Sequence, residues 1–233
     1  MPRTRQAHRA REDMRMPLYK FMTAAHAKDA IRQHRIKIST ISDLNDPYEM
    51  VPCIVDANGA LMYSTETVRA TLQGHLTPRH GLICLSKSID EPLLWSHYAD
   101  KHKGIALVFN FPADEWIVKI KYKQDRVSID LSGEGELSPK LYGAYEQLIK
   151  QKYTGWKHEQ EYRFIVEINP HTLKDGFYWK ELPPEYFSGV VLGCLCEDAE
   201  CDIQKLLHES GFKNAKVARA QMNPRQYKMN LPE

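Results

Sequence analysis

The stretch Trp156-Lys157-His158-Glu159-Gln160-Glu161-Tyr162-Arg163 runs directly into the apolar segment Phe164-Ile165-Val166. This transition is typical of the start of a β-strand, in which successive side chains alternate between the two faces. Glu159, Glu161 and Arg163 are then expected on one face. Three charged side chains on a strand that enters a hydrophobic core indicate ion pairs, a solvated cleft or catalysis. An edge strand with a solvated ladder of ion pairs is the structural alternative.

The rest of the chain has the composition of an ordinary globular protein. Of its 233 residues, 42% are hydrophobic and 27% are charged. This length is enough for one well-buried core and does not require a second domain, so we expect a single domain over residues 17–233. The 32 Lys and Arg nearly balance the 30 Asp and Glu, and the total charge therefore indicates no particular partner.

The N-terminal segment, residues 1–16, is basic. Its charged residues are Arg3, Arg5, Arg9, Arg11 and Arg15 against Glu12 and Asp13. Because it contains no apolar run, we expect a flexible arm that contacts nucleic acid or another polyanion; a tail without a role is the alternative. The arm lacks the apolar region of a secretory signal, and no later segment approaches the roughly 18 apolar residues of a membrane span. We therefore expect a cytoplasmic protein with no membrane partner.

The cysteines do not form a recognisable metal or disulfide pattern. They are Cys53, Cys84, Cys194, Cys196 and Cys201, and without a secretory signal they are expected to be reduced. The last three, with His208, lack the two-residue spacing of zinc ligands, so no metal is expected. Cys84 has apolar neighbours and is interpreted as a buried structural thiol rather than a nucleophile.

Hydrophobic periodicity predicts many short elements in mixed order. The expected strands are 18–21, 37–40, 81–86, 104–109, 116–122, 162–168, 190–192 and 215–218. The expected helices are 24–34, 65–74, 92–101, 141–153 and 198–211. This order indicates an α+β domain.

Polar residues gather in four places beside predicted strand ends or helix starts. These are Tyr19 with Lys20; Ser39 with Asn45, Asp46 and Glu49; Trp95-Ser96-His97-Tyr98 with His102 and Gly104; and Lys152, Trp156, Glu159, Glu161 and Arg163. The sequence has no phosphate-binding glycine loop, no nucleophile elbow and no paired-histidine zinc helix. Since no other motif competes with them, we expect the four groups to form one concave site.

Several of these segments together resemble the motif set of a bacterial family of unknown function. The motifs are Leu44–Glu49, Cys84–Ser86, Leu94–Ala99 with His102–Gly104, and Trp156 with Glu159–Arg163. They occur in the family's order between Leu18 and about Leu192. The resemblance implies no activity.

The order of elements also resembles that of ADP-ribosyltransferases, in which a Glu-x-Glu motif heads a late strand. That resemblance implies short strands in two small mixed sheets with flanking helices, and NAD in a cleft between the sheets. It implies that Glu161, the last acid of the motif, is catalytic. Tyr19 or Lys20 corresponds to the first-strand position, where the family has His or Arg, and Ser39 with Thr40 corresponds to the second strand.

The chemistry of this resemblance gives each group an expected role. A carboxylate bonded to the ribose 2-hydroxyl stabilises an oxocarbenium-like transition state, and Glu161 is assigned to it. Glu159 is expected to orient or deprotonate the acceptor, and Arg163 or Lys152 to keep the acids ionised or to pair with a pyrophosphate. The aromatic side chains expected to stack on nicotinamide, adenine or a target base are Trp95, Tyr98 and Trp156. The remaining residues assigned to NAD binding are Asn45 and Glu49.

The resemblance therefore implies an ADP-ribosyltransferase-like enzyme that uses NAD to modify a macromolecule. Nucleic acid is the expected target, in a bacterial toxin or phage-defence setting with an antitoxin protein as partner. Two alternatives remain open. One is a metal-independent nuclease or nucleotide hydrolase that uses His97, Glu161 and Arg163. The other is a ligand-sensing or interaction module in which the same charges only bind.

Overall fold

The computed structural model describes residues 17–75, 80–111, 117–130, 137–169, 173–182 and 184–231. The predicted basic arm, residues 1–16, lies outside the described residues. No helix in the described part of the chain is long and apolar enough to span a membrane.

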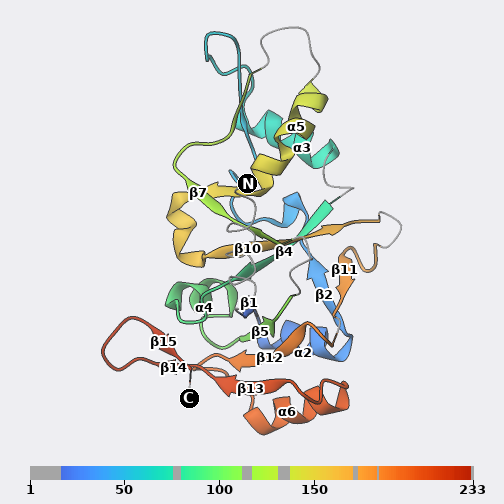
Figure 1. The fold of residues 1–233 in the computed structure, drawn as a ribbon, viewed down its shortest axis with the longest axis vertical. Helices are drawn as coiled ribbons and strands as arrows, with labels where there is room; N and C mark the ends of the chain where they lie inside the picture. Colours follow the sequence, from blue (N-terminus) through green and yellow to red (C-terminus); the bar gives the residue numbers. More distant parts are fainter. Residues whose placement is uncertain are drawn as a thin grey trace, which may run out of the picture.

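A seven-stranded sheet forms the centre of the molecule, in the order β13-β12-β5-β1-β4-β10-β6 (Figure 1). The bounds of these strands are β1 Leu18–Met22, β4 His80–Ser86, β5 Ile105–Phe109, β6 Ile117–Lys119, β10 Glu161–Glu167, β12 Phe187–Leu192 and β13 Lys216–Arg219. Neighbouring strands of this sheet are antiparallel, except that β12 and β13 are parallel. The inner strands are nearly continuous apolar runs because both faces of the sheet are covered.

Four two-stranded pairs surround this sheet in the described residues. They are β2 (Arg35–Ile38) with β11 (Tyr178–Glu181), β3 (Cys53–Val55) with β8 (Ser128–Asp130), β7 (Lys121–Lys123) with β9 (Gln151–Tyr153), and β14 (Gln221–Met222) with β15 (Met229–Asn230). The predicted α+β class is confirmed. The strands are distributed differently from the expected two small sheets, because seven of the described strands join one central sheet and the other eight form the four pairs.

Five α-helices and two 3-10 turns lie among the strands in the part of the chain that the structure describes. They are α2 (Ala24–Arg32), α3 (Thr65–His75), α4 (Pro92–Tyr98), α5 (Leu137–Ile149), α6 (Glu200–Glu209), η1 (Ile41–Asp43) and η2 (Thr154–Glu159). Helix α2 begins where the Thr23 hydroxyl accepts a hydrogen bond from the His26 backbone N–H. Helix α4 begins at Pro92, which needs no N–H partner there, and is capped by Glu91.

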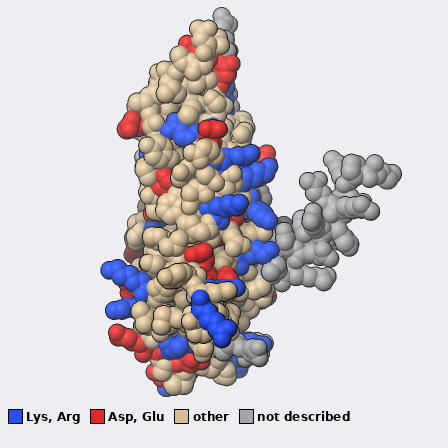
Figure 2. Space-filling view, turned by 90° about the vertical axis from the view of Figure 1, so that its left-hand side faces the viewer, with Lys and Arg blue, Asp and Glu red and all other residues tan. Residues whose placement is uncertain are grey.

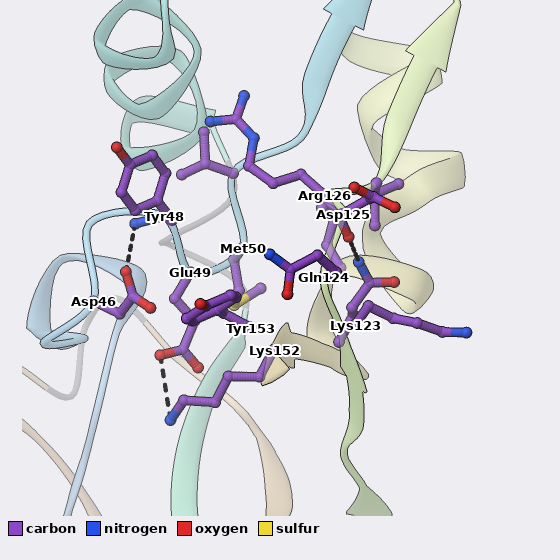
Figure 3. Close-up of a pocket in the computed structure, with 14 residues that line it drawn as sticks. Asp46, Tyr48, Glu49, Met50, Lys123, Gln124, Asp125, Arg126, Lys152 and Tyr153 are labelled. Atoms are coloured by element: carbon purple, nitrogen blue, oxygen red, sulfur yellow. Dashed lines mark hydrogen bonds and ion pairs between the residues drawn. The ribbon is translucent and has the colours of Figure 1, made fainter. Parts of the chain in front are cut away.

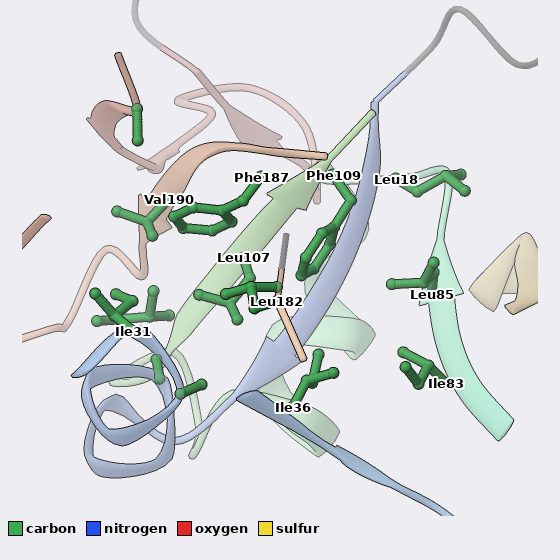
Figure 4. Close-up of a cluster of buried hydrophobic side chains, with 14 of the residues drawn as sticks. Leu18, Ile31, Ile36, Ile83, Leu85, Leu107, Phe109, Leu182, Phe187 and Val190 are labelled. Atoms are coloured by element: carbon green, nitrogen blue, oxygen red, sulfur yellow. The ribbon is translucent and has the colours of Figure 1, made fainter. Parts of the chain in front are cut away.

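Three hydrophobic clusters cover the sheet. The largest packs α2 and α6 against one face and includes Leu107, Phe109 and Val190 (Figure 4). A second includes residues of α3, α5 and β10, and a third packs α4 against β1 and β5. Strand β10 alternates between them, since Phe164 contacts the first cluster and Ile165 the second. Glu161 and Arg163 alternate in step with Ile165 and consequently lie on the side of the second cluster.

Candidate functional site

Glu161 and Arg163 lie on the same face of β10, as the alternation predicts, and Arg163 Nε donates a hydrogen bond of 2.8 Å to Glu161. Glu159 was expected on the same strand, but it is the last residue of η2. Gln160 separates the two acids in a left-handed conformation with φ of 45°. This turn directs Glu159 toward the same cluster, so the predicted grouping holds although the local structure is different.

A single lysine joins the two acids of the Glu-x-Glu motif. Lys152 Nζ lies 2.6 Å from Glu159 Oε2 and 3.0 Å from Glu161 Oε2, and it is 3.6 Å from Glu49 Oε2. Arg163 completes the network by donating to Glu161, to Glu49 and to the Ile149 carbonyl. Three carboxylates therefore share two cations.

All five side chains of this network are at most 5% exposed. Burial raises the pKa of Glu161, an effect that Lys152 opposes and Glu159 reinforces. Burial alone lowers the pKa of Lys152, but the attraction of Glu161 and Glu159 outweighs it and the pKa is raised. Burial lowers the pKa of Arg163 to about 9, which leaves it protonated at neutral pH. The cluster thus holds its charges in contact with each other rather than with water.

The network is fixed by bonds from neighbouring elements. Tyr19, Ser86 and Glu161 lie side by side in the registers of β1, β4 and β10. The Ser86 hydroxyl donates a hydrogen bond of 2.6 Å to the Glu159 carbonyl oxygen. The Tyr122 hydroxyl accepts a hydrogen bond of 2.7 Å from the Glu161 backbone N–H. The acids therefore occupy defined positions instead of exposed, mobile ones.

Beside this network lies a cavity of about 250 Å³, here called the acid cavity. The predicted site residues that line it are Tyr19, Lys20, Ser39, Asn45, Glu49, Tyr98, Glu159 and Glu161. They come from all four polar groups of the sequence. Lys152, Cys84 and Ser86 also line it. Cys84 was interpreted only as a structural thiol; its register opposite Arg163 places it here, and burial raises its pKa.

Five other predicted residues do not line the acid cavity. Trp95 is fully buried and packs edge-on against Phe21, and its indole N–H donates a hydrogen bond to the Ile89 carbonyl oxygen. The expected stacking of Trp95 on a ligand is therefore wrong. His97 is exposed on α4, and its ring centre is 6.5 Å from that of Trp156.

The other three have structural partners. The Trp156 indole N–H donates a hydrogen bond of 2.8 Å to Asp46. Lys152 Nζ lies 5.4 Å from the centre of the Trp156 ring. Thr40 takes part in the capping of η1. Arg163 is completely buried behind Glu161 and Glu49. It therefore acts on the acids and does not face the acid cavity.

A further cavity of about 440 Å³, here called the side cavity, adjoins the acid cavity. The two share Lys20, Phe21, Ser39 and Tyr98 as lining residues. Cations and aromatic rings meet in the side cavity. Arg35 lies 3.9 Å from the ring centre of Trp179, and Lys37 lies 4.4 Å from that of Phe177. This side can accept an anionic group and a flat ring.

Two further expectations concern metals and thiols. In the residues that the structure describes, no group of three or more His, Cys, Asp or Glu side chains is arranged to hold a metal ion. The five cysteines are all free.

Comparison with known proteins identifies one segment. Residues 94–164 match the model of a family described as a protein of unknown function (DUF2971). The predicted resemblance to a family of unknown function is thereby confirmed for this segment, which contains the Leu94–Gly104 and Trp156–Arg163 motifs. No curated protein and no solved structure matches the chain significantly. These comparisons name no activity and do not confirm the resemblance to ADP-ribosyltransferases.

Proposed function

We propose that the acid cavity is the active site of an ADP-ribosyltransferase-like enzyme that uses NAD as a substrate. The observation that carries this proposal is the pair Glu159 and Glu161, which line one cavity and share the cation Lys152. In the reaction, the bond between the nicotinamide nitrogen and ribose C1 breaks, and nicotinamide leaves with the electron pair. A lone pair of the acceptor forms the new bond to C1, and the acceptor's proton passes to a carboxylate or to water.

The buried acids suit the charge that this reaction creates. Positive charge develops on the ribose, and a fixed carboxylate in a poorly solvated site stabilises it strongly. Glu161 accepts bonds from Lys152 and Arg163, and Glu159 accepts from Tyr98 and Lys152. A carboxylate offers about four lone-pair positions. Glu161 accepts two bonds from Arg163 and one from Lys152, which leaves about one position for a ribose hydroxyl, and Glu159 keeps about two. Glu161 binds the ribose hydroxyl, and Glu159 orients or deprotonates the acceptor.

The side cavity accommodates the rest of the dinucleotide. Because the two cavities share Lys20, Phe21, Ser39 and Tyr98, a ligand longer than the acid cavity can extend from one to the other. The pyrophosphate pairs with the cations of the side cavity, and adenine stacks on an aromatic ring there. Lys20 supplies the first-strand cation where ADP-ribosyltransferases have His or Arg.

The hydrolase alternative is less well supported by the geometry. Its expected catalytic set was His97, Glu161 and Arg163, but His97 is exposed and outside the acid cavity, and Arg163 has no exposed surface. The toxin or phage-defence setting and an antitoxin partner belong to the same proposal and follow from the resemblance of motifs alone.

The test is release of nicotinamide from NAD by the purified protein. Glu161→Gln should lower the rate about a hundredfold or more, because it removes a charge that acts mainly in the transition state. Since Glu161 is also paired with Lys152 and Arg163, circular dichroism must show that the variant is folded. Glu167→Gln, on the exposed end of the same strand, is the matched control and should keep the wild-type rate. Folded Glu161→Gln and Glu159→Gln proteins with full activity would refute the proposal.

A further inference from the structure

A separate cavity of about 310 Å³, here called the outer cavity, lies on the other side of Glu49 and Lys152. These two residues line both the outer cavity and the acid cavity. Figure 3 shows Lys152 below the other labelled residues, with its ammonium beside the Glu49 carboxylate; the remaining lining residues include Tyr48, Arg126 and Tyr153. A molecule bound in the outer cavity would therefore be separated from the catalytic acids by one layer of side chains.

The ribbon formed by β7 and β9 explains this arrangement. In its parallel register Tyr122 lies beside Lys152, and Lys123 lies beside Tyr153. Because side chains alternate along a strand, the first pair points toward the acid network and the second pair points away from it. Tyr122 and Lys152 both bond to Glu161, whereas Lys123 and Tyr153 are exposed. One short ribbon thus serves the acids on its inner face and the outer cavity on its outer face.

Glu49, which lines both the outer cavity and the acid cavity, carries a buried acceptor that is not saturated. Among the described residues, Glu49 Oε2 has no hydrogen-bond partner, although the side chain is only 1% exposed. The Lys152 ammonium is 3.6 Å away, which is an ion-pair distance rather than a hydrogen bond. A buried acceptor of this kind is costly unless a ligand donates to it. A planar group with an N–H edge, such as an amino-bearing nucleobase, meets that requirement.

The rim of the outer cavity combines aromatic rings with cations. Tyr48 is 60% exposed and Tyr153 is 50% exposed, far more than is usual for such large side chains. The Arg126 guanidinium lies 5.8 Å from the Tyr48 ring centre and is held by Thr65 and by the Pro52 carbonyl.

Exposed lysines continue from this rim along the chain. Lys119, Lys121 and Lys123 are exposed at every second position. Lys121 and Lys123 lie on the same strand, β7, and are therefore spaced by roughly 6.7 Å, a separation similar to that of successive phosphates in an extended strand. Figure 2 views the side of the molecule that carries β7 and shows Lys and Arg side chains gathered at its mid-height.

We infer that the outer cavity binds one unstacked base of a single-stranded nucleic acid whose backbone follows Lys121 and Lys123. Aromatic rings that stack on bases beside a line of cations are the features by which proteins hold single strands. The inference rests on the proposed function in one respect: the bound strand would be the acceptor of ADP-ribose, with one base held in the outer cavity and the reacting nucleotide placed in the acid cavity on the other side of Glu49 and Lys152. A protein target would not account for the regular cation spacing together with the base-sized cavity.

The test is equilibrium binding of a fluorescent single-stranded oligonucleotide to the full chain, without NAD, at two salt concentrations. Tyr153→Ala should weaken binding about tenfold, since one base–aromatic stack is lost. Lys123→Ala should lower the slope of log K against log salt by about 0.7, the value for one phosphate contact on a single strand. The matched controls are Tyr227→Ala, at a fully exposed tyrosine of the β14–β15 hairpin, and Lys205→Ala, on α6.

Binding that Tyr153→Ala and Lys123→Ala weaken, and that the two controls leave at the wild-type level, would support the inference. Equal binding by all four variants, or no binding by the wild-type chain, would overturn it. This measurement requires no NAD turnover. The binding site and the proposed transferase activity can therefore fail independently.

Discussion

The Tyr98 hydroxyl donates a hydrogen bond of 2.5 Å to Glu159 Oε1, across 61 positions of sequence. It joins the end of α4 to the end of η2, and both residues fall inside the segment that matches the family of unknown function. Burial and the charge of Glu159 raise the pKa of Tyr98. One contact thus connects the two longest motifs of the chain at the acid cavity.

This contact predicts a change in alkaline stability. A tyrosine whose folded pKa is above its ordinary value near 10 stabilises the fold below that pH, and the stabilisation is lost as the pH rises further. Wild-type protein should therefore lose stability above about pH 10 more steeply than Tyr98→Phe, by up to about 1.4 kcal/mol per pH unit. Urea unfolding from pH 9 to 11 measures this. Tyr227→Phe, at a fully exposed ring, should behave as wild type, and an identical decline in Tyr98→Phe would contradict the role of the bond.

Removing the shared cation should unfold the site. Lys152→Met leaves Glu159 and Glu161 buried without their common partner, and breaking such a buried pair costs about 3–5 kcal/mol. The free energy of unfolding in urea should fall by that amount. Lys150→Met is the control, because Lys150 pairs with the exposed Glu146 and a surface pair contributes at most about 1 kcal/mol. A loss below about 1 kcal/mol for Lys152→Met would show that the acids do not depend on it.

The glycine that follows α4 has no room for a side chain. A Cβ at Gly104 would lie 2.2 Å from the Met22 carbonyl oxygen and 2.8 Å from Ala99 backbone atoms. Gly104→Ala should therefore lower the melting temperature by several degrees, since backbone must shift. Gly143→Ala, in α5 with no atom near its Cβ, should be neutral or slightly stabilising. Equal melting temperatures for the two variants would exclude the predicted clash.

The basic arm gives a prediction that concerns the target. If the acceptor is nucleic acid, removal of residues 1–15 should weaken oligonucleotide binding and flatten its salt dependence, because phosphate contacts release counterions. Nicotinamide release from NAD should persist, since the acid cavity is built from residues 19–161. Unchanged affinity at low and high salt would show that the arm does not take part, and loss of NAD turnover would contradict its separation from the site.

Local patterns predicted most elements because each strand or helix has its own apolar period. Predicted boundaries differ where pairing is set by distant residues. The expected helix 141–153 ends at Ile149, and Gln151–Tyr153 becomes β9 because it pairs with β7. The expected strand 116–122 divides at Ile120, since β6 pairs with β10 and β7 with β9.

The site was predictable as a set of residues but not as a network. Charged residues before an apolar run indicated Glu161 and Arg163 directly. The contact of Arg163 with Glu49 joins residues 114 positions apart, which no local pattern specifies. The exclusion of Trp95 likewise depends on its packing against Phe21, a tertiary contact. Aromatic residues next to a polar motif can equally be core, and only burial distinguishes the two.

The proposed activity is tested most directly with NAD carrying separate labels in the nicotinamide ring and the adenylate. Incubated with the full chain and single-stranded nucleic acid, the ring label should be released as free nicotinamide while the adenylate label becomes attached to the nucleic acid. Glu161→Gln should slow both the release and the attachment about a hundredfold or more, and Glu167→Gln should slow neither. If both labels remain on intact NAD with the wild-type chain, the acid cavity is not an ADP-ribosyltransferase site.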